Sequence, residues 1–204
     1  KMTSDNHIIY MKNTRNQSDD DVNTLKLLKS IDILIIKTQK GSKKLQKLIE
    51  NNKNPEIIRY IHNLIKPNLY SIINNKFGNY FFQKLIPLLD YSLRSEFWGM
   101  IFNNFLTISQ NEFGNHVLQT LITYSTGNIH EEKVIFNYIN QYFYSLAFDT
   151  FGKFIVLKAI SIFSDLYKER LIKKVEENLN SLIFNINSVV IVKKYIKIVN
   201  SNRD

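Results

Sequence analysis

Residues 78–85 read Gly-Asn-Tyr-Phe-Phe-Gln-Lys-Leu, and residues 114–121 read Gly-Asn-His-Val-Leu-Gln-Thr-Leu. The two stretches carry glycine, asparagine, an aromatic ring and glutamine in the same order, 36 residues apart. Related stretches begin at Gly41 and Gly152, and one further step of 36 residues reaches Ser188. The chain therefore repeats one sequence unit about five times, and this repeat decides the fold.

Apolar residues keep the register of these five anchors. Units two to five carry apolar side chains 17, 13, 9 and 6 residues before the anchor, and spacings of four, four and three follow one face of a helix. Each unit is thus predicted to be an amphipathic helix, a short break and a second helix that begins near the anchor. Eight residues after the anchors stand Ile49, Ile86, Ile122, Ile160 and Ile196, and four residues after them stand Leu45, Phe82, Leu118, Val156 and Val192.

The repeat predicts an all-α solenoid. A unit of two helices cannot bury its apolar face alone, so neighbouring units must stack to form a continuous core. The predicted array covers residues 19–200, and residues 1–18 form a polar, flexible leader without periodicity. The predicted units are residues 19–54, 55–90, 91–126, 127–164 and 165–200.

Composition favours a polyanionic partner. The 204 residues include 27 Lys and Arg against 18 Asp and Glu, a net charge of +9, which suits a nucleic acid or an anionic membrane surface. A merely solvated basic surface is the alternative. Cysteine is absent, which excludes disulfides, a thiol nucleophile and a cysteine zinc site. No apolar run is long enough to span a membrane, so we expect a soluble intracellular protein.

The second helix of each unit carries the candidate binding residues. Positions one, two and five after the anchor share one helix face, so Asn79, Tyr80 and Gln83 are predicted to lie together, opposite Phe81 and Phe82. A ring can stack on an unpaired base while amides hydrogen-bond to its edge. Ordinary surface polarity, with the ring packed on a neighbour, is the alternative. Recurrence of the pattern at the same period favours base recognition.

These stretches resemble the RNA-reading helices of the Pumilio (PUF) family. The resemblance covers residues 19–200 and implies a right-handed crescent of about five repeats of about 36 residues, whose inner face binds one RNA base per repeat. The family pattern implies that units three, two and one read 5′-UUA-3′, since Asn with Gln reads uracil and Ser with Gln reads adenine. The implied base-edge residues are Ser42, Gln46, Asn79, Gln83, Asn115 and Gln119, and the implied stacking residues are Lys43, Tyr80, His116 and Phe154.

Units four and five depart from that pattern. Unit four has Lys153, Phe154 and Leu157, so it keeps a ring for stacking but lacks the glutamine. Unit five has no glycine at its anchor and no reading residue, so it is expected to cap the array or to contact phosphate through Lys193 and Lys194. Five visible repeats instead of the family's usual eight leave two alternatives open: a part of a longer array, or a shorter or divergent branch such as the members that process ribosomal RNA. The expected role is regulation of mRNA through 3′ untranslated regions, with ribosomal RNA processing as the alternative.

The sequence contains no motif of a known catalytic or cofactor site. A phosphate loop, a serine nucleophile elbow and a zinc-protease motif are all absent, and no histidine has chelating spacing to His116. We expect a protein that is not an enzyme and that needs no metal, cofactor or small-molecule substrate. The expected partners are single-stranded RNA and, on the convex face, regulatory proteins. A protein-binding scaffold is the rival hypothesis, and membrane association ranks last. The expected location is the cytoplasm, with the nucleolus as the alternative.

Overall fold

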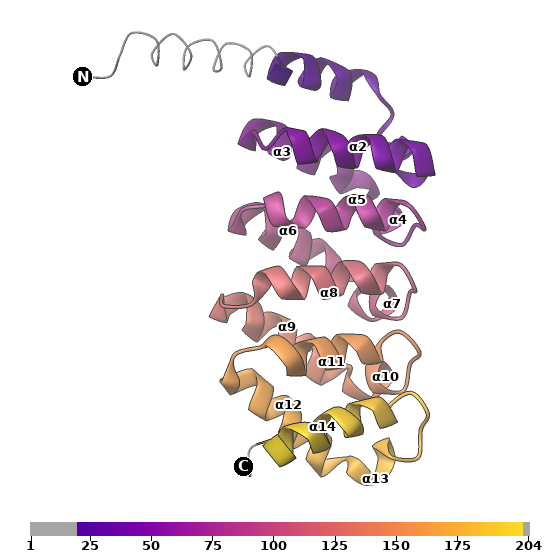
Figure 1. Cartoon of the computed structure of the whole chain (residues 1–204), viewed down its shortest axis with the longest axis vertical. Helices are drawn as coiled ribbons and strands as arrows, with labels where there is room; N and C mark the ends of the chain where they lie inside the picture. Colours follow the sequence, from indigo (N-terminus) through magenta and orange to yellow (C-terminus); the bar gives the residue numbers. More distant parts are fainter. Residues whose placement is uncertain (1–19, 202–204) are drawn as a thin grey trace, which may run out of the picture.

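The structure is a computed structural model that describes residues 20–201. The predicted leader, residues 1–18, lies outside the described residues. Within residues 20–201 the chain forms helices and no strand, and the helices are stacked in order along the long axis of the molecule (Figure 1). The prediction of an all-α repeat solenoid is confirmed. None of the helices in this part of the chain is long and apolar enough to cross a membrane.

Each unit contains three helices where the sequence predicts two. In unit two an outer helix, α3 (Pro55–Ile65), is followed by a short helix, α4 (Leu69–Ile73), and an inner helix, α5 (Gly78–Leu85). Unit one consists of residues 20–30, η1 (Ile33–Lys37) and the inner helix α2 (Gln39–Asn51). The later units are α6 (Tyr91–Phe102), α7 (Phe105–Ser109) and α8 (Gly114–Ser125); α9 (Ile129–Gln141), α10 (Phe143–Ala147) and α11 (Lys153–Ile162); and α12 (Asp165–Glu177), α13 (Leu179–Leu182) and α14 (Val189–Ser201).

The predicted first helix is divided because its apolar pattern continues across a local break. In unit two the break is η2 (Lys66–Asn68), which contains Pro67. Proline lacks the N–H that a continuing helix needs. In units three and five, Asn104 (φ −128°, ψ 23°) and Asn178 (φ −119°, ψ 14°) leave helical geometry. The apolar residues on both sides of the break still face one core, so spacing alone could not reveal it.

Every inner helix is preceded by a capping residue that the sequence analysis missed. Three residues before the anchor, Asn75 Oδ1 accepts hydrogen bonds of 2.9 Å from the backbone N–H groups of Phe77 and Gly78. Such a side-chain acceptor satisfies amide groups that a helix start leaves without partners. The same position is occupied in the other units by Thr38, Asn111, Asp149 and Asn185.

The anchor glycine marks a close approach between the inner helix and the short element before it. A Cβ atom built at Gly78 would lie 2.4 Å from the backbone oxygen of Ile72, six residues earlier. In unit five the anchor is Ser188, and its hydroxyl donates a 2.6 Å hydrogen bond to the equivalent oxygen, that of Leu182. Serine therefore replaces a steric contact by a hydrogen bond, and unit five stays in register.

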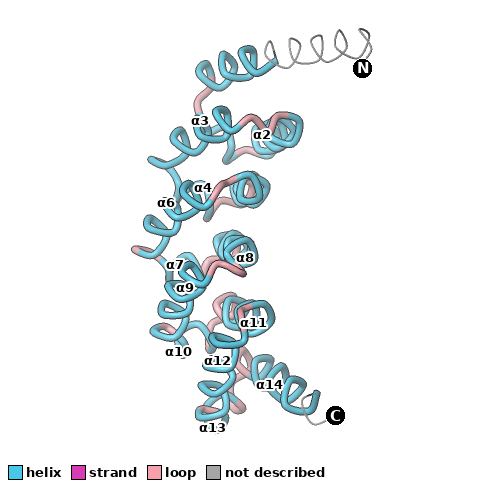
Figure 2. Tube along the Cα trace, turned by 90° about the vertical axis from the view of Figure 1, so that its left-hand side faces the viewer, coloured by secondary structure: helices cyan, strands magenta, loops and turns pink. Residues whose placement is uncertain are grey.

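The stacked units bend into a crescent. In Figure 2 both ends of the array curve toward the side on which α2, α8, α11 and α14 lie, and the outer helices α6, α9 and α12 lie on the other side. The inner helices thus line a concave side. The apolar residues predicted from the register form the core between the layers, except that Leu179 is only partly buried and Ile196 is 49% exposed.

Candidate nucleic-acid interface

The inner helices carry most of the excess positive charge. They contain ten lysines and a single carboxylate, Glu50, which pairs with Lys84 at 2.9 Å. The outer helices α3, α6, α9 and α12 carry seven basic and eight acidic side chains. The concave side therefore attracts a polyanion, while the convex side is close to neutral. The ten lysines are Lys40, Lys43, Lys44, Lys47, Lys84, Lys153, Lys158, Lys193, Lys194 and Lys197.

The second position after the anchor is exposed in units one to four. Tyr80 is 59% exposed and Phe154 is 42% exposed, although both are large apolar rings. Lys43 and His116 are exposed at the same position of their units. The structure therefore sets out one ring or cation per unit along the inner helices, as stacking between successive bases requires.

The first position after the anchor is buried in units one to three, which corrects the prediction of one open face shared by positions one, two and five. Ser42 and Asn79 are each 2% exposed and Asn115 is 1% exposed. The Ser42 hydroxyl donates to the backbone oxygen of Phe77 in the next unit at 2.8 Å. Asn115 Nδ2 makes the same bond to Phe151 at 2.7 Å. The prediction holds for one isolated helix, whereas in the array the next unit binds this position in units one and three.

Asn79 is tied down within its own unit. Its Nδ2 donates to the backbone oxygens of Asn75 and Lys76 at 2.8 and 3.0 Å. At the equivalent position of unit four, Lys153 Nζ donates to Asn187 Oδ1 of unit five at 2.8 Å. In units one, three and four this position therefore joins neighbouring units, and in unit two it secures the start of its own inner helix.

The glutamines at the fifth position are partly exposed and are held by the first position. Gln83 Nε2 donates to Asn79 Oδ1 at 3.0 Å, and Gln119 Nε2 donates to Asn115 Oδ1 at 2.6 Å. A carboxamide has two N–H groups and an oxygen with two lone pairs, so each glutamine keeps a donor and an acceptor for a ligand. In unit one, Gln46 Nε2 donates to Ser42 Oγ at 2.9 Å in the same way.

Unit four and unit five lack this arrangement. Leu157 is partly buried at the glutamine position of unit four, and Phe154 stands beside Lys153, whose Nζ lies 5.3 Å from the ring centroid. In unit five Val189 and Val190 are partly buried, while Lys193 is exposed. The pair formed by a buried first-position side chain and a partly exposed glutamine is thus confined to units one, two and three.

Two shifted ionisable groups lie on the outer helices and not on the concave side. A 2.6 Å hydrogen bond from Lys66 lowers the pKa of the Glu96 carboxyl. Partial burial lowers the pKa of Lys174, whose Nζ donates to the backbone oxygen of Asn140 in the preceding unit. Both groups bridge neighbouring units. Among residues 20–201, no group of three or more His, Asp or Glu side chains could hold a metal ion.

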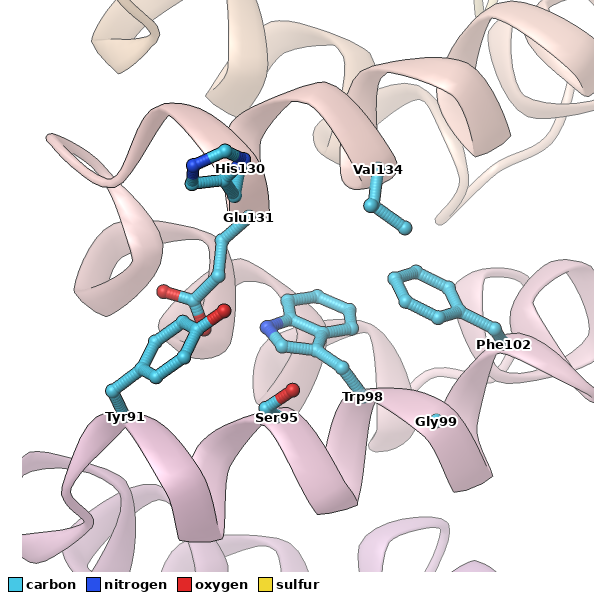
Figure 3. Close-up of a pocket in the computed structure, with 8 residues that line it drawn as sticks. All are labelled: Tyr91, Ser95, Trp98, Gly99, Phe102, His130, Glu131 and Val134. Atoms are coloured by element: carbon cyan, nitrogen blue, oxygen red, sulfur yellow. The ribbon is translucent and has the colours of Figure 1, made fainter.

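A second candidate site lies on the convex side between α6 and α9 (Figure 3). It is a pocket of about 240 Å³. Its walls are fixed: Trp98 Nε1 donates to Ser125 Oγ at 3.0 Å, the Phe102 ring stacks on Trp98, and Arg94 holds Glu131 at 2.9 Å. The lining residues are Tyr91, Ser95, Trp98, Gly99, Phe102, His130, Glu131 and Val134.

Helix α6 differs from the other outer helices at this pocket. Its outward positions hold Ser95, Gly99 and Phe102, and a Cβ atom added at Gly99 would meet nothing within 4 Å. These three residues are uncharged, and Phe102 supplies an apolar wall to the pocket. The equivalent residues of the other units are polar or charged: Arg59, Asn63 and Lys66; Lys133, Asn137 and Asn140; Glu169, Lys173 and Glu176.

The fold and the concave side define a helical-repeat solenoid with a basic inner surface. The family model of the Pumilio-family RNA binding repeat matches residues 68–90 and 104–132. These two matches contain the short and inner helices of units two and three, including Gln83 and Gln119. The resemblance to Pumilio (PUF) repeats seen in the sequence is thus confirmed over these two segments. No curated protein matches the chain in sequence.

Solved structures share the fold. The Puf4 RNA binding domain bound to the HO endonuclease RNA 3′ UTR recognition sequence is 18% identical, with a TM-score of 0.75, covering 82% of this chain and 51% of that one. The RNA-binding domain of yeast Puf5p bound to AAT2 RNA is 23% identical, with a TM-score of 0.69, covering 83% and 49%. PUF-8 in complex with PBE-RNA is 18% identical, with a TM-score of 0.77, covering 85% and 53%. The chain spans about half the length of each.

Proposed function

We propose that the concave side binds single-stranded RNA, with one base held at each of units one to four. The observation that carries the proposal is the shared register of exposed stacking residues and amide-bearing glutamines along a basic surface. Tyr80 and His116 are exposed one unit apart, and Gln83 and Gln119 follow them by the same interval. Bases stacked on these side chains would present their edges to the glutamines.

Units three, two and one are proposed to read 5′-UUA-3′. Each glutamine keeps one N–H and one oxygen lone pair, which complement the donor and acceptor that uracil and adenine both present. We assign the discrimination between uracil and adenine to the first-position residue that accepts a hydrogen bond from the glutamine. That residue is an amide at Asn79 and Asn115 and a hydroxyl at Ser42. Unit four would hold a base on Phe154 without selecting it.

The proposed biological role is post-transcriptional regulation of mRNA in the cytoplasm. It is supported by the likeness to Puf4, which was solved with a 3′ UTR recognition sequence. Processing of ribosomal RNA in the nucleolus is the alternative, since it would use the same surface. The two roles differ in the RNA that would be recovered with the protein, messenger or ribosomal.

The class of ligand is tested by fluorescence anisotropy with a short UUA-containing RNA and the DNA of matching sequence, across a salt series. We expect RNA to bind more tightly, with affinity falling as salt rises because lysines release counterions from phosphate. A variant with Lys43, Lys193 and Lys197 changed to Gln should show a shallower salt dependence. Absence of RNA binding at low salt would reject the proposal.

A second function, protein binding on the convex side, is favoured by the uncharged positions Ser95, Gly99 and Phe102 of α6, which line the pocket. The pocket between α6 and α9 would receive one bulky apolar side chain of a partner peptide. Peptides selected by display on the protein should share such an anchor and lose binding to Gly99→Lys, which fills the pocket, while RNA affinity stays unchanged. Peptides that bind Gly99→Lys equally well would place the site elsewhere.

A further inference from the structure

The sixth residue after the anchor reaches back to the inner helix of the preceding unit. In unit two this residue is Lys84, whose Nζ pairs with Glu50 of unit one at 2.9 Å. In unit three it is Thr120, whose hydroxyl oxygen lies 3.3 Å from Oε1 of Gln83 in unit two. The helices that carry this second pair, α5 and α8, pack side by side. A residue of unit three therefore contacts the glutamine that unit two is proposed to use.

Unit three differs from the other units at this sixth position. A lysine ends in a strongly hydrated cation on a flexible stem, whereas threonine has a short, β-branched side chain with few rotamers. Thr120 therefore holds its hydroxyl at a fixed place beside Gln83. The other four units carry Lys47, Lys84, Lys158 and Lys194 at the sixth position.

The Thr120 hydroxyl is also fixed within its own helix. It donates to the backbone oxygen of His116, one turn earlier in α8, at 2.9 Å. The same hydroxyl hydrogen is shared with Gln83 Oε1 at 3.3 Å, which is a three-centre hydrogen bond. The side chain of Thr120 is partly buried, so this hydroxyl is one of the polar groups that border the glutamine.

Gln83 is held at both ends of its carboxamide. Asn79 Oδ1 accepts from its Nε2 at 3.0 Å, and the Thr120 hydroxyl contacts its Oε1. The carboxamide keeps one N–H group and one oxygen lone pair for a base. A glutamine that is ordered before binding avoids the loss of rotamer freedom when the base arrives. Its remaining donor and acceptor also have fixed directions, which favours one base edge over the others.

We propose that Thr120 of unit three is a positioning residue for base recognition in unit two, where it increases the preference for uracil. This role rests on the proposed reading of the middle base by Gln83. The base preference of unit two then depends on two neighbouring units, and the inner helix of unit two does not determine it alone.

The test compares Thr120→Val with the unaltered protein on RNAs that carry uracil, cytosine or no base at the middle position. Valine keeps the shape of threonine and removes the hydroxyl. We expect the preference for uracil over cytosine to fall by about two- to ten-fold, as for the loss of one hydrogen bond, with unchanged affinity for the RNA that lacks the base. Thr123→Val is the matched control, because its hydroxyl makes the same bond within α8, to the Gln119 backbone oxygen at 2.8 Å.

Relaxation of the glutamine side-chain amides, measured by NMR without RNA, separates this role from the proposed function. Thr120→Val should make the Gln83 carboxamide more mobile and leave that of Gln119 unchanged. An equally rigid Gln83 in the variant, or a uracil preference that survives the loss of the hydroxyl, would overturn the inference and leave the proposed reading intact. Weaker binding of the RNA that lacks the base would show a merely structural role and overturn it too. If the unaltered protein bound all three RNAs equally, the reading by Gln83 would be rejected and the inference would fall with it.

Discussion

Asn115 Nδ2 donates a hydrogen bond of 2.7 Å to the backbone oxygen of Phe151, which lies in the next unit of the array. The same Nδ2 donates to the backbone oxygen of Ser109 at 2.7 Å, and Asn115 Oδ1 accepts from Gln119. One buried side chain therefore joins two units and orients the residue proposed to read a base. Asn115 therefore contributes to stability directly and to the proposed recognition through Gln119. Substitutions at Asn115 and Gln119 can separate the two contributions.

Asn115→Ala should destabilise the fold. The change leaves the buried backbone oxygen of Ser109 without its amide donor, which costs about 1–3 kcal/mol. It also removes the bond to the Phe151 oxygen in the next unit, which keeps a 3.0 Å hydrogen bond from the Phe154 N–H. Urea denaturation measures the free energy of unfolding. Gln119→Ala is the matched control, because Gln119 is partly exposed and is expected to change RNA affinity with little change in stability. Equal loss of stability in both variants would mean that Asn115 is not the joint between units.

Tyr80→Ala should weaken RNA binding by about ten-fold or more, because stacking of a base on an aromatic ring contributes about 1–3 kcal/mol. Stability should change little, since Tyr80 is 59% exposed. Anisotropy titration gives the affinity. Tyr124→Ala serves as control, because Tyr124 is also exposed on an inner helix but lies outside the stacking position. An unchanged affinity for Tyr80→Ala would show that this ring does not stack on RNA.

Asn79→Ser combined with Gln83→Glu should move the preference at the middle base from uracil toward guanine. A carboxylate only accepts hydrogen bonds, whereas the Gln83 amide offers both a donor and an acceptor. The introduced serine hydroxyl can donate to the introduced carboxylate, which preserves the contact now made between these two residues. Binding to four RNAs that differ only at that base measures the preference, and an unaltered order of affinities would contradict the assignment for unit two.

Gly78→Ala and Gly99→Ala should have opposite effects on stability. A methyl group at Gly78 meets the backbone oxygen of Ile72 at 2.4 Å, so the inner helix has to move, at a cost of about 1–3 kcal/mol. Gly99 lies inside a helix with open space around it, so alanine there should stabilise by about 0.5–1 kcal/mol. Thermal denaturation compares the two. If Gly78→Ala left the stability unchanged, close packing would not be the reason why glycine recurs at the anchors.

The exposed and core positions of the inner helices could be predicted from the sequence, because the geometry of a single helix determines which positions face outward and which face the core. The second position after the anchor, as at Tyr80, and the fourth, as at Phe82, point to opposite sides of any helix with this register. The short helices could not be predicted from spacing, since Ile65 and Leu69 face one core across the break at Pro67.

The burial of Asn79 and Asn115 depends on neighbouring structure and therefore escaped the sequence analysis. An isolated helical wheel places them with the glutamines. The carbonyl groups that bind Asn79 lie in the turn before its own helix, and one of those that bind Asn115 lies in the next unit. The capping residues Asn75, Asn111, Asp149 and Asn185 recur three positions before the anchors, so the interval itself can be found in the sequence. Because the chain is rich in asparagine, a recurring asparagine does not stand out from its surroundings.

The most direct test of the account is the affinity of the full chain for RNAs in which each base of a UUA-containing oligonucleotide is replaced in turn. The account predicts loss of affinity for changes at the three bases of UUA and tolerance at the base held by unit four, where Leu157 replaces the glutamine. Equal binding to every substituted and scrambled RNA would contradict it, and would leave a basic solenoid that holds nucleic acid without reading it.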